Sequence, residues 1–316
     1  MFNQESLQIQ HILHPLALKS GINLYMARAD KVHHLASGNK IYKIRPHLEH
    51  VKNNDIKQLL SFGGAFSNHI HALALMAKQY NLDSIGIIRG EKEYANNPTL
   101  KDAMNAGMHL EFVSREEYKQ RNNADYLNDL QKRFPDSLII PEGGSSQLAI
   151  SGCAQLAKDI NTLQKSDILT VASGTGATMA GLVCGLANNQ KAIAYAVLKD
   201  KSLTGRIEHF ILKEGCENEN YEIRKADFGG YAKLDNDVLS FILDWLEQTG
   251  ILLDPVYTGK MCMRVMQQLE AGEFRSDTSI TMIHSGGLQG WRGMQRRVKH
   301  LAGNRVWQRI SDGLSL

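Results

Sequence analysis

Residues 37–43 read Ser-Gly-Asn-Lys-Ile-Tyr-Lys, and this stretch contains the residue, Lys40, around which the other motifs of the chain are expected to gather. Lys40 follows a turn and opens a segment in which Ile41 and Ile44 recur at helical spacing. The partial positive charge of a helix N-terminus disfavours a second cation, so it lowers the pKa of a lysine amine placed there. A neutral amine is a nucleophile. Lys40 is therefore a candidate for covalent chemistry, and the alternative is an ordinary solvated lysine.

Four later stretches are rich in glycine and hydroxyl residues, and most of them follow an apolar run that predicts a strand. They are residues 61–69 (Ser-Phe-Gly-Gly-Ala-Phe-Ser-Asn-His), 172–180 (Ala-Ser-Gly-Thr-Gly-Ala-Thr-Met-Ala), 254–260 (Asp-Pro-Val-Tyr-Thr-Gly-Lys) and 283–287 (Ile-His-Ser-Gly-Gly). Open α/β sheets bind ligands at the carboxyl ends of their strands. The sequence therefore predicts a ligand site built from these loops.

The composition is that of a soluble globular protein, with 316 residues, 43% hydrophobic and 22% charged. A net charge of +3 with interspersed signs gives no reason to expect nucleic acid as a partner. The N-terminal residues lack a basic flank followed by an apolar run, and no apolar run approaches the length of a membrane span. We expect a cytoplasmic protein that binds neither nucleic acid nor membranes.

The four cysteines, at positions 153, 184, 216 and 262, lie far apart and show no metal-ligand spacing. We expect no metal site and no disulfide, and we expect all four to be ordinary buried thiols.

Short apolar runs alternate with amphipathic segments along the chain, which predicts βαβ units and parallel sheets. The runs fall at residues 58–62, 84–88, 110–113 and 137–140, and again at 168–171, 192–197 and 279–283. Residues 118–134 read as one helix, whereas 199–227 are poorly patterned and suggest a helix-loop insertion. A break near residue 150 separates the two series. The predicted fold class is α/β, with two lobes and a cleft between them.

Two of the glycine and hydroxyl stretches have the character of anion sites. Residues 173–178 join a predicted strand to a predicted helix, so their backbone N–H groups could surround a single phosphate. The stretch lacks the lysine of a P-loop and the third glycine of a dinucleotide fingerprint. Ser67 and Asn68 could hold a carboxylate in the same way. The alternatives are a plain turn and a plain helix cap, and His69 and His284 receive no chemical role.

Five motifs, in order, resemble those of the 1-aminocyclopropane-1-carboxylate deaminase and D-cysteine desulfhydrase family, which are pyridoxal-phosphate enzymes of the tryptophan-synthase-β fold. They are Ser37-Gly-Asn-Lys40, Gly63-Gly-Ala-Phe-Ser-Asn68, Gly174-Thr-Gly-Ala-Thr178, Asp254-Pro-Val-Tyr-Thr-Gly-Lys260 and His284-Ser-Gly-Gly287. The resemblance spans about residues 20 to 290. It implies two lobes, each a mainly parallel twisted sheet flanked by helices, with the active site in the cleft. Residues 46–150 would form the small lobe, and 1–45 with 151–316 the large cofactor-binding lobe.

The resemblance also implies roles for individual residues. Lys40 would carry pyridoxal 5'-phosphate and move the substrate α-proton, Asn68 would contact the cofactor's phenolic oxygen, and Ser67 would bind the substrate carboxylate. Tyr231 and Tyr257 look like the family's two active-site tyrosines. The phosphate would lie on Gly174, Thr175, Gly176, Ala177 and Thr178. The chain departs from the commoner Gly-Gly-Asn-Lys-Thr-Arg-Lys form at positions 37, 41 and 42. These differences affect the inference about the substrate and leave the assignment of Lys40 unchanged.

Thr258 and Ser285 distinguish the two branches of that family, because the deaminases have Glu and Leu there and the desulfhydrases have hydroxyl residues. A neutral hydroxyl near the cofactor's ring nitrogen leaves a weaker electron sink than a carboxylate does. This favours β-elimination from a small β-substituted amino acid, foremost D-cysteine, giving pyruvate, ammonia and sulfide.

Other functions remain open at this point. The chain could be a 1-aminocyclopropane-1-carboxylate deaminase, or a fold-related dehydratase, racemase or sulfhydrylase, or it could bind pyridoxal phosphate without catalysis. The resemblance further implies a homodimer.

Overall fold

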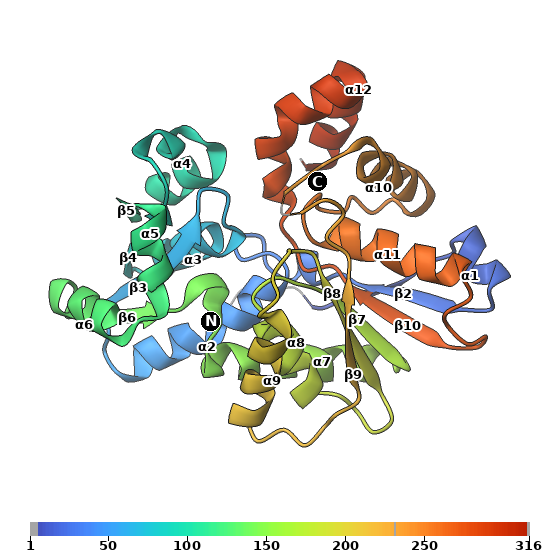
Figure 1. The fold of residues 1–316 in the computed structure, drawn as a ribbon, viewed down its shortest axis with the longest axis horizontal. Coiled ribbons are helices and arrows are strands. Elements are labelled where there is room, and N and C mark those ends of the chain that lie inside the picture. The colour runs from blue at the N-terminus through green and yellow to red at the C-terminus, as the bar shows by residue number, and fades with distance from the viewer. Residues whose placement is uncertain (1–5, 231, 315–316) are drawn as a thin grey trace.

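The computed structural model describes residues 6–230 and 232–314, and its strands form two sheets (Figure 1). The larger sheet has the order β1-β2-β10-β7-β8-β9, and the smaller has the order β5-β4-β3-β6. All neighbouring strands are parallel except β1 and β2. The bounds in the larger sheet are β1 Ile9–His11, β2 Asn23–Ala27, β10 Ser279–Ile283, β7 Ile168–Ser173, β8 Lys191–Ala196 and β9 Tyr221–Lys225, and those in the smaller sheet are β5 His109–Val113, β4 Asp83–Arg89, β3 Gln58–Gly64 and β6 Ser137–Ile140.

Helices flank both sheets, and α7, α8 and α9 lie on one side of the larger sheet with α10 and α11 on the other (Figure 1). None of the helices within 6–230 and 232–314 is long and apolar enough to cross a membrane. The helices are α1 Pro15–Lys19, α2 Asn39–Asn53, α3 Asn68–Gln79, α4 Pro98–Asn105, α5 Arg115–Lys119, α6 Ala124–Arg133, α7 Gln147–Leu163, α8 Ala177–Cys184, α9 Leu203–Lys213, α10 Asn236–Thr249, α11 Thr258–Glu270 and α12 Trp291–Leu314, with short 3₁₀ turns that include η4 Glu142–Gly144 and η5 Leu288–Gly290.

The predicted fold class is confirmed, because parallel sheets flanked by helices make up the chain. The predicted lobe boundaries at residues 46 and 150 stay a prediction. Helix α2 continues through the first of them and helix α7 through the second.

The hydrophobic core follows the two-residue alternation of the strands. In β3, Leu59 faces the cluster that includes side chains of α2, α3, α7 and α8, whereas Leu60 and Phe62 face a separate cluster with Tyr118 and Leu130. All five side chains are buried. A strand covered on both faces reads as a continuous apolar run, which is why the sequence located β3 well.

Both sheets have a point at which the direction of strand order reverses. In the larger sheet it lies between β7 and β10, and in the smaller sheet between β3 and β6. The loops that leave adjacent strands at such a point diverge and create a crevice at the carboxyl ends. The glycine and hydroxyl stretches after β3, β7 and β10 therefore arise at the two positions where this fold binds ligands.

Two of the expected elements differ from the structure. Residues 118–134 are not one helix, because the Asn123 side chain accepts from the N–H groups of Asp125 and Tyr126 and starts α6 afresh. In the segment 199–227 the expected helix is present as α9, but the strand β9 follows it where a loop was expected. Strand β9 lies at the sheet edge and is only partly buried, so its apolar pattern is weak.

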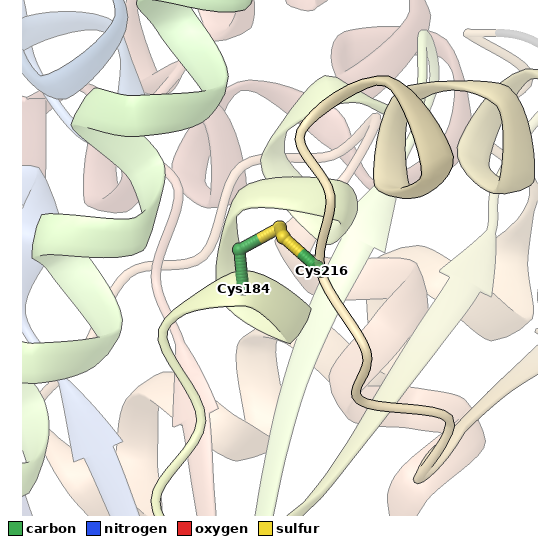
Figure 2. Close-up of a disulfide and its surroundings, with 2 residues drawn as sticks. All are labelled: Cys184 and Cys216. Atoms are coloured by element: carbon green, nitrogen blue, oxygen red, sulfur yellow. A yellow bond between two sulfur atoms is a disulfide. The ribbon is translucent and has the colours of Figure 1, made fainter.

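The cysteine prediction was wrong for two of the four thiols. Cys184 and Cys216 form a disulfide with a Cα–Cα distance of 5.4 Å (Figure 2). Cys184 ends α8 and Cys216 follows α9, and these neighbouring helices bring together residues that are 32 positions apart. No local sequence pattern records such a pairing. Cys153 and Cys262 are buried free thiols, as expected.

We predict that Gly38→Ala is strongly destabilising. Gly38 has φ 73°, and a Cβ there would lie 1.9 Å from the Ser285 carbonyl oxygen. The left-handed conformation alone costs a residue with a side chain about 1–2 kcal/mol, and the clash adds to it. Urea unfolding should show the loss. The control is Gly205→Ala in α9, where a Cβ meets no heavy atom within 4 Å and stability should be unchanged or slightly higher. Equal unfolding midpoints for the two variants would contradict this account.

Candidate active site

Lys40 lies in the first turn of α2, directly after the Gly38 turn. Its Nζ donates to Asn39 Oδ1 at 2.6 Å, and Asn39 Nδ2 donates to Thr178 Oγ1 at 2.7 Å. Asn39 is buried, and its bond to Thr178 is buried as well, whereas its bond to Lys40 lies beside the cavity and is partly buried. A single amide thus connects the lysine amine to the start of α8, although the sequence assigned Asn39 no role.

The pKa of Lys40 is lowered to about 7, which makes the amine partly neutral at neutral pH. Burial is the main cause and the nearby Lys43 cation is the second, while Cys153 and Asp254 act in the opposite direction. The sequence predicted this direction from the helix dipole. The direction agrees, and the largest cause in the folded chain is desolvation.

Other basic groups near Lys40 are also buried. Lys43 Nζ donates to the Gly143 carbonyl at 2.9 Å, and burial lowers its pKa. His69 Nε2 bonds Ser61 Oγ at 2.9 Å, and its pKa falls well below the usual value because of burial and the two lysines. The His69 Nδ1 atom has no hydrogen-bond partner among the described residues. The region therefore disfavours positive charge on each of its bases.

The loop after β7 has the features of an anion site. The Ser173 hydroxyl is buried without a hydrogen-bond partner in the part of the chain that the structure describes. Gly176 has φ 95° and directly precedes α8, which starts at Ala177. Arg206 approaches the carbonyl groups of Gly174 and Thr175 at 3.3 and 3.4 Å and so holds the loop from outside. An orphaned hydroxyl beside a helix N-terminus fits a bound phosphate monoester.

Ser67 and Asn68 lie at the start of α3. Ser67 Oγ accepts from Ile70 N at 3.2 Å, so the hydroxyl does serve as a helix cap, and its hydrogen stays available as a donor. Asn68 Oδ1 accepts from Gln289 Nε2 at 2.8 Å, which leaves the Asn68 Nδ2 group to act as the donor. A Cβ at Gly287 would lie 2.6 Å from that nitrogen. Only glycine there allows Asn68 its position.

Thr258 and Ser285 form a buried pair of hydroxyl groups, with their Oγ atoms 3.3 Å apart. The buried carboxylate of Asp254 accepts from the backbone N–H groups of Tyr257 and Thr258, both at 2.7 Å. Asp254 thereby orients the start of α11. The Tyr257 ring lies beside the anion loop, because a Cβ at Gly174 would be 3.4 Å from its Cε1 atom.

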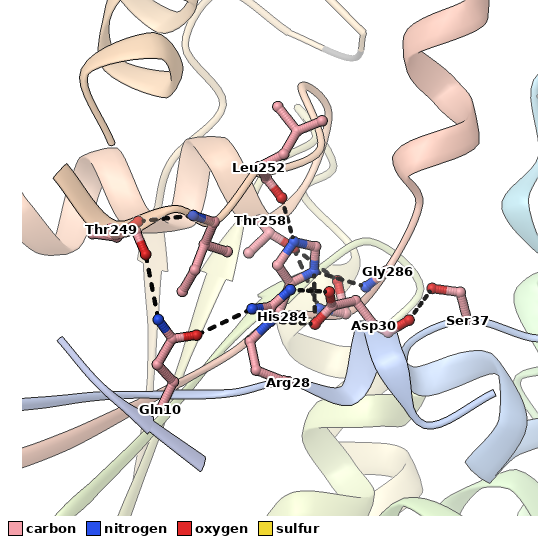
Figure 3. Close-up of polar contacts among 11 residues, drawn as sticks. Gln10, Arg28, Asp30, Ser37, Thr249, Leu252, Thr258, His284 and Gly286 are labelled. Atoms are coloured by element: carbon pink, nitrogen blue, oxygen red, sulfur yellow. Dashed lines mark hydrogen bonds and ion pairs between the residues drawn. The ribbon is translucent and has the colours of Figure 1, made fainter. Parts of the chain in front are cut away.

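His284 has a structural role in the loop after β10 (Figure 3). Its Nε2 donates to the Leu252 carbonyl at 2.9 Å, and its Nδ1 accepts from Gly286 N at 3.2 Å. Asp30 lies nearby and forms an ion pair with Arg28 at 2.7 Å. Burial alone would raise the pKa of Asp30, but the Arg28 guanidinium, which bonds both carboxylate oxygens, lowers that pKa.

The structure brings together all the described residues to which the sequence assigned a role. A cavity of about 350 Å³ has Lys40, Asn68 and Gly287 in its wall. The contacts described above connect these residues with Ser67, Tyr257, Thr258, Ser285 and the loop 174–178. Tyr231 lies outside the described residues. Sequence reasoning missed Asn39, Ser173 and Asp254, each adjacent to or within a quoted motif, and Gln289, for which there was no signal.

Comparison with known proteins points to one family. The sequence profile described as "Pyridoxal-phosphate dependent enzyme" matches residues 12–286. The chain is 28% identical over 321 residues to a bifunctional D-cysteine desulfhydrase/1-aminocyclopropane-1-carboxylate deaminase of Arabidopsis thaliana, covering 93% of this chain and 79% of that protein. It is 26% identical to a D-cysteine desulfhydrase of Serratia proteamaculans, covering 84% and 87%. A solved structure of an ACC deaminase homologue superposes with a TM-score of 0.84 at 26% identity, covering 94% of each chain.

We predict that the Lys40 amine reacts at neutral pH. Because its pKa is lowered to about 7 from 10.5, the neutral fraction should rise as the pH increases through about 7, over three pH units below an ordinary lysine. Cofactor-free protein treated with an amine-arylating reagent should be modified at Lys40 with that midpoint, as read by peptide mapping. Lys40→Ala supplies the background. A midpoint near the ordinary lysine value would show that the amine is not desolvated.

Proposed function

This chain belongs to the family of pyridoxal-phosphate dependent enzymes, and from that premise we propose that it catalyses β-elimination from a small β-substituted amino acid, foremost D-cysteine. The chain is a pyridoxal-phosphate-dependent lyase. The observation that carries the proposal is the Lys40 amine, which has its pKa lowered to about 7 and faces a cavity beside Asn68.

The residues present fit the cofactor. In the proposal, Lys40 holds the cofactor covalently, and the loop from Gly174 to Thr178 holds its phosphate with help from the unpartnered Ser173 hydroxyl. The Asn68 Nδ2 donor contacts the phenolic oxygen, and its orientation is fixed by Gln289. Bound pyridoxal phosphate supplies an electron sink for charge that develops at the substrate α-carbon.

This chain's own groups would bind the substrate carboxylate and remove the α-proton. The N–H groups at the start of α3 and the Ser67 hydroxyl bind the substrate carboxylate. Lys40, once displaced by the substrate amine, removes the α-proton as a general base. The β-substituent leaves with the bonding electron pair, the β-carbon takes up a proton to become the methyl group of pyruvate, and water then replaces the amino group and supplies the carbonyl oxygen. D-cysteine would give pyruvate, ammonia and sulfide. Tyr257, and by resemblance Tyr231, would flank the reacting atoms.

The hydroxyl pair Thr258 and Ser285 supports elimination over opening of a cyclopropane ring. Neither hydroxyl can hold a proton on the ring nitrogen as a carboxylate would, so the cofactor stays a weaker electron sink. A thiolate is a good leaving group and needs less help. The second candidate is 1-aminocyclopropane-1-carboxylate deamination, because one relative carries both activities in its name. We further propose a cytoplasmic homodimer.

The first test concerns the lysine. Borohydride reduction of the holoenzyme followed by peptide mapping should find the cofactor on Lys40. Lys40→Ala should lose the adduct and about 10²–10⁴-fold in activity, the usual contribution of a general base. The matched control is Lys52→Ala, an exposed lysine on the same helix, which should keep both. An adduct on Lys43 or Lys260 would overturn the mechanism.

The second test concerns the substrate. Purified enzyme should release 2-oxo acid from D-cysteine or a β-chloro amino acid and leave 1-aminocyclopropane-1-carboxylate almost untouched. Thr258→Glu with Ser285→Leu should lower the elimination by about tenfold or more and introduce deamination. Ready ammonia release from the cyclopropane substrate by the unmodified enzyme would refute the role of the two hydroxyls. A cofactor spectrum that no amino acid changes would instead indicate a non-catalytic carrier.

A further inference from the structure

One side of the cavity beside Lys40 is built from groups that the proposed steps do not use. Besides Lys40 and Asn68, its wall includes His71 of α3 and Arg292 of α12. Arg292 forms an ion pair with Asp102 of α4, and Asp102 Oδ2 also accepts from His71 Nε2 at 3.0 Å. We call these three residues, His71, Asp102 and Arg292, the Arg292 wall.

The Arg292 wall continues the active site by one helical turn. Asn68 and His71 are three residues apart on α3, so they share one face of the helix. Gln289 and Arg292 are also three residues apart: Gln289 bonds Asn68 directly, whereas Arg292 bonds Asp102, which in turn accepts from His71. One turn of helix is about 5 Å. The wall therefore lies about one helical turn along α3 from Asn68 and lines the same cavity.

The chemistry of the Arg292 wall suits an anion. An arginine offers five N–H donors in a planar fork, and in the described chain only one nitrogen of Arg292 contacts an acceptor, Asp102 Oδ2. The carboxylate anchors the guanidinium, and about a third of the Arg292 side chain, 37%, is exposed. An anchored, partly exposed guanidinium is preorganised for a carboxylate or a similar acid.

The two carboxylates at or near the cavity, Asp30 and Asp102, are each paired with an arginine. Asp30 also faces the cavity, but it is nearly buried and is bonded by Arg28 through both carboxylate oxygens. Asp102 is paired with Arg292, and His71 bonds it through a neutral ring N–H, because burial lowers the pKa of His71. The apolar side chains of Leu35, Ala72 and Leu288 also line the cavity, and they would cover a short hydrocarbon or thioether stem of the substrate.

We propose that the Arg292 wall binds a negatively charged group on the substrate's β-substituent, so that the enzyme prefers β-substituted amino acids whose substituent ends in an acid. This inference rests on the proposed function and narrows its substrate class. The α-carboxylate goes to the start of α3, and the second acid goes to Arg292. Elimination then releases the substituent as a thiolate or equivalent that still carries its acid.

The experiment compares two cysteine thioethers that differ in one charge, S-carboxymethylcysteine and S-methylcysteine, in D and L forms, with the holoenzyme. The wild-type ratio of kcat/KM should favour the acid by about tenfold or more, the worth of one charge-assisted hydrogen bond. Arg292→Leu should lower the ratio of kcat/KM for the acid to kcat/KM for the methyl compound by about tenfold or more, since the lost interaction is made only by the acid. Arg292→Lys, which keeps the charge but not the fork, should retain part of the preference. Arg296→Leu, at an exposed arginine one turn further along α12, is the matched control and should match wild type.

Three outcomes separate the alternatives. If Arg292→Leu slows both compounds equally, Arg292 only pairs with Asp102 for structure, and the inference fails. If the wild type shows no preference for the acid, the inference fails as well. If no amino acid yields 2-oxo acid, the proposed function fails. Calorimetric binding of the two compounds to wild-type and Arg292→Leu holoenzyme then still decides the inference. Equal affinities of the wild type for the two compounds would overturn it, and a preference for the acid that is lost in the variant would support it.

Discussion

The bare backbone of Gly38, pressed against the Ser285 carbonyl, is the constraint on which the site depends. No side chain can occupy that space, and the next residue, Asn39, lies with its N–H 3.4 Å from the same oxygen. The turn before α2 is thereby fixed to the loop after β10, although 247 positions separate Gly38 from Ser285 in the sequence. This contact sets where α2 begins, and so where Lys40 points. A residue with a Cβ would push the two loops apart and separate the amine from the hydroxyl pair.

Desolvation then gives the amine its reactivity. Lys40, Lys43 and His69 are grouped where water is scarce, and each disfavours a proton on its neighbours. Leaving a lysine neutral is less costly than burying it as a cation without a carboxylate partner. The stability lost by gathering these groups is offset by the large apolar cluster that α2, α3, α7 and α8 share.

A few polar bonds join the two sheets around the site. Lys43 reaches the turn after β6, Gln289 holds Asn68, and Asn39 holds Thr178. The first two bonds connect segments that follow different sheets, and the third connects the start of α2 to the start of α8. The groups that would contact one ligand are therefore positioned relative to each other and not merely within their own loops. Preorganisation of this kind lowers the cost of orienting a bound cofactor and substrate.

The sequence by itself determined the sheet type, the positions of the buried strands and the motifs of the site. It could do so because buried parallel strands leave uninterrupted apolar runs, and because glycine and hydroxyl residues at their ends are local features. The sequence did not predict three features: the edge strand β9, the division of residues 118–134 and the Cys184–Cys216 disulfide. The strand and the disulfide depend on partners distant in the chain. The division depends on a helix cap that lies within a helical pattern. Only the tertiary structure decided that Asn39 joins Lys40 to Thr178 and that burial lowers the lysine's pKa. It also decided that Arg292 and His71 share one cavity with Lys40. Desolvation and long-range packing arise from the folded chain as a whole, so no stretch of sequence contains them.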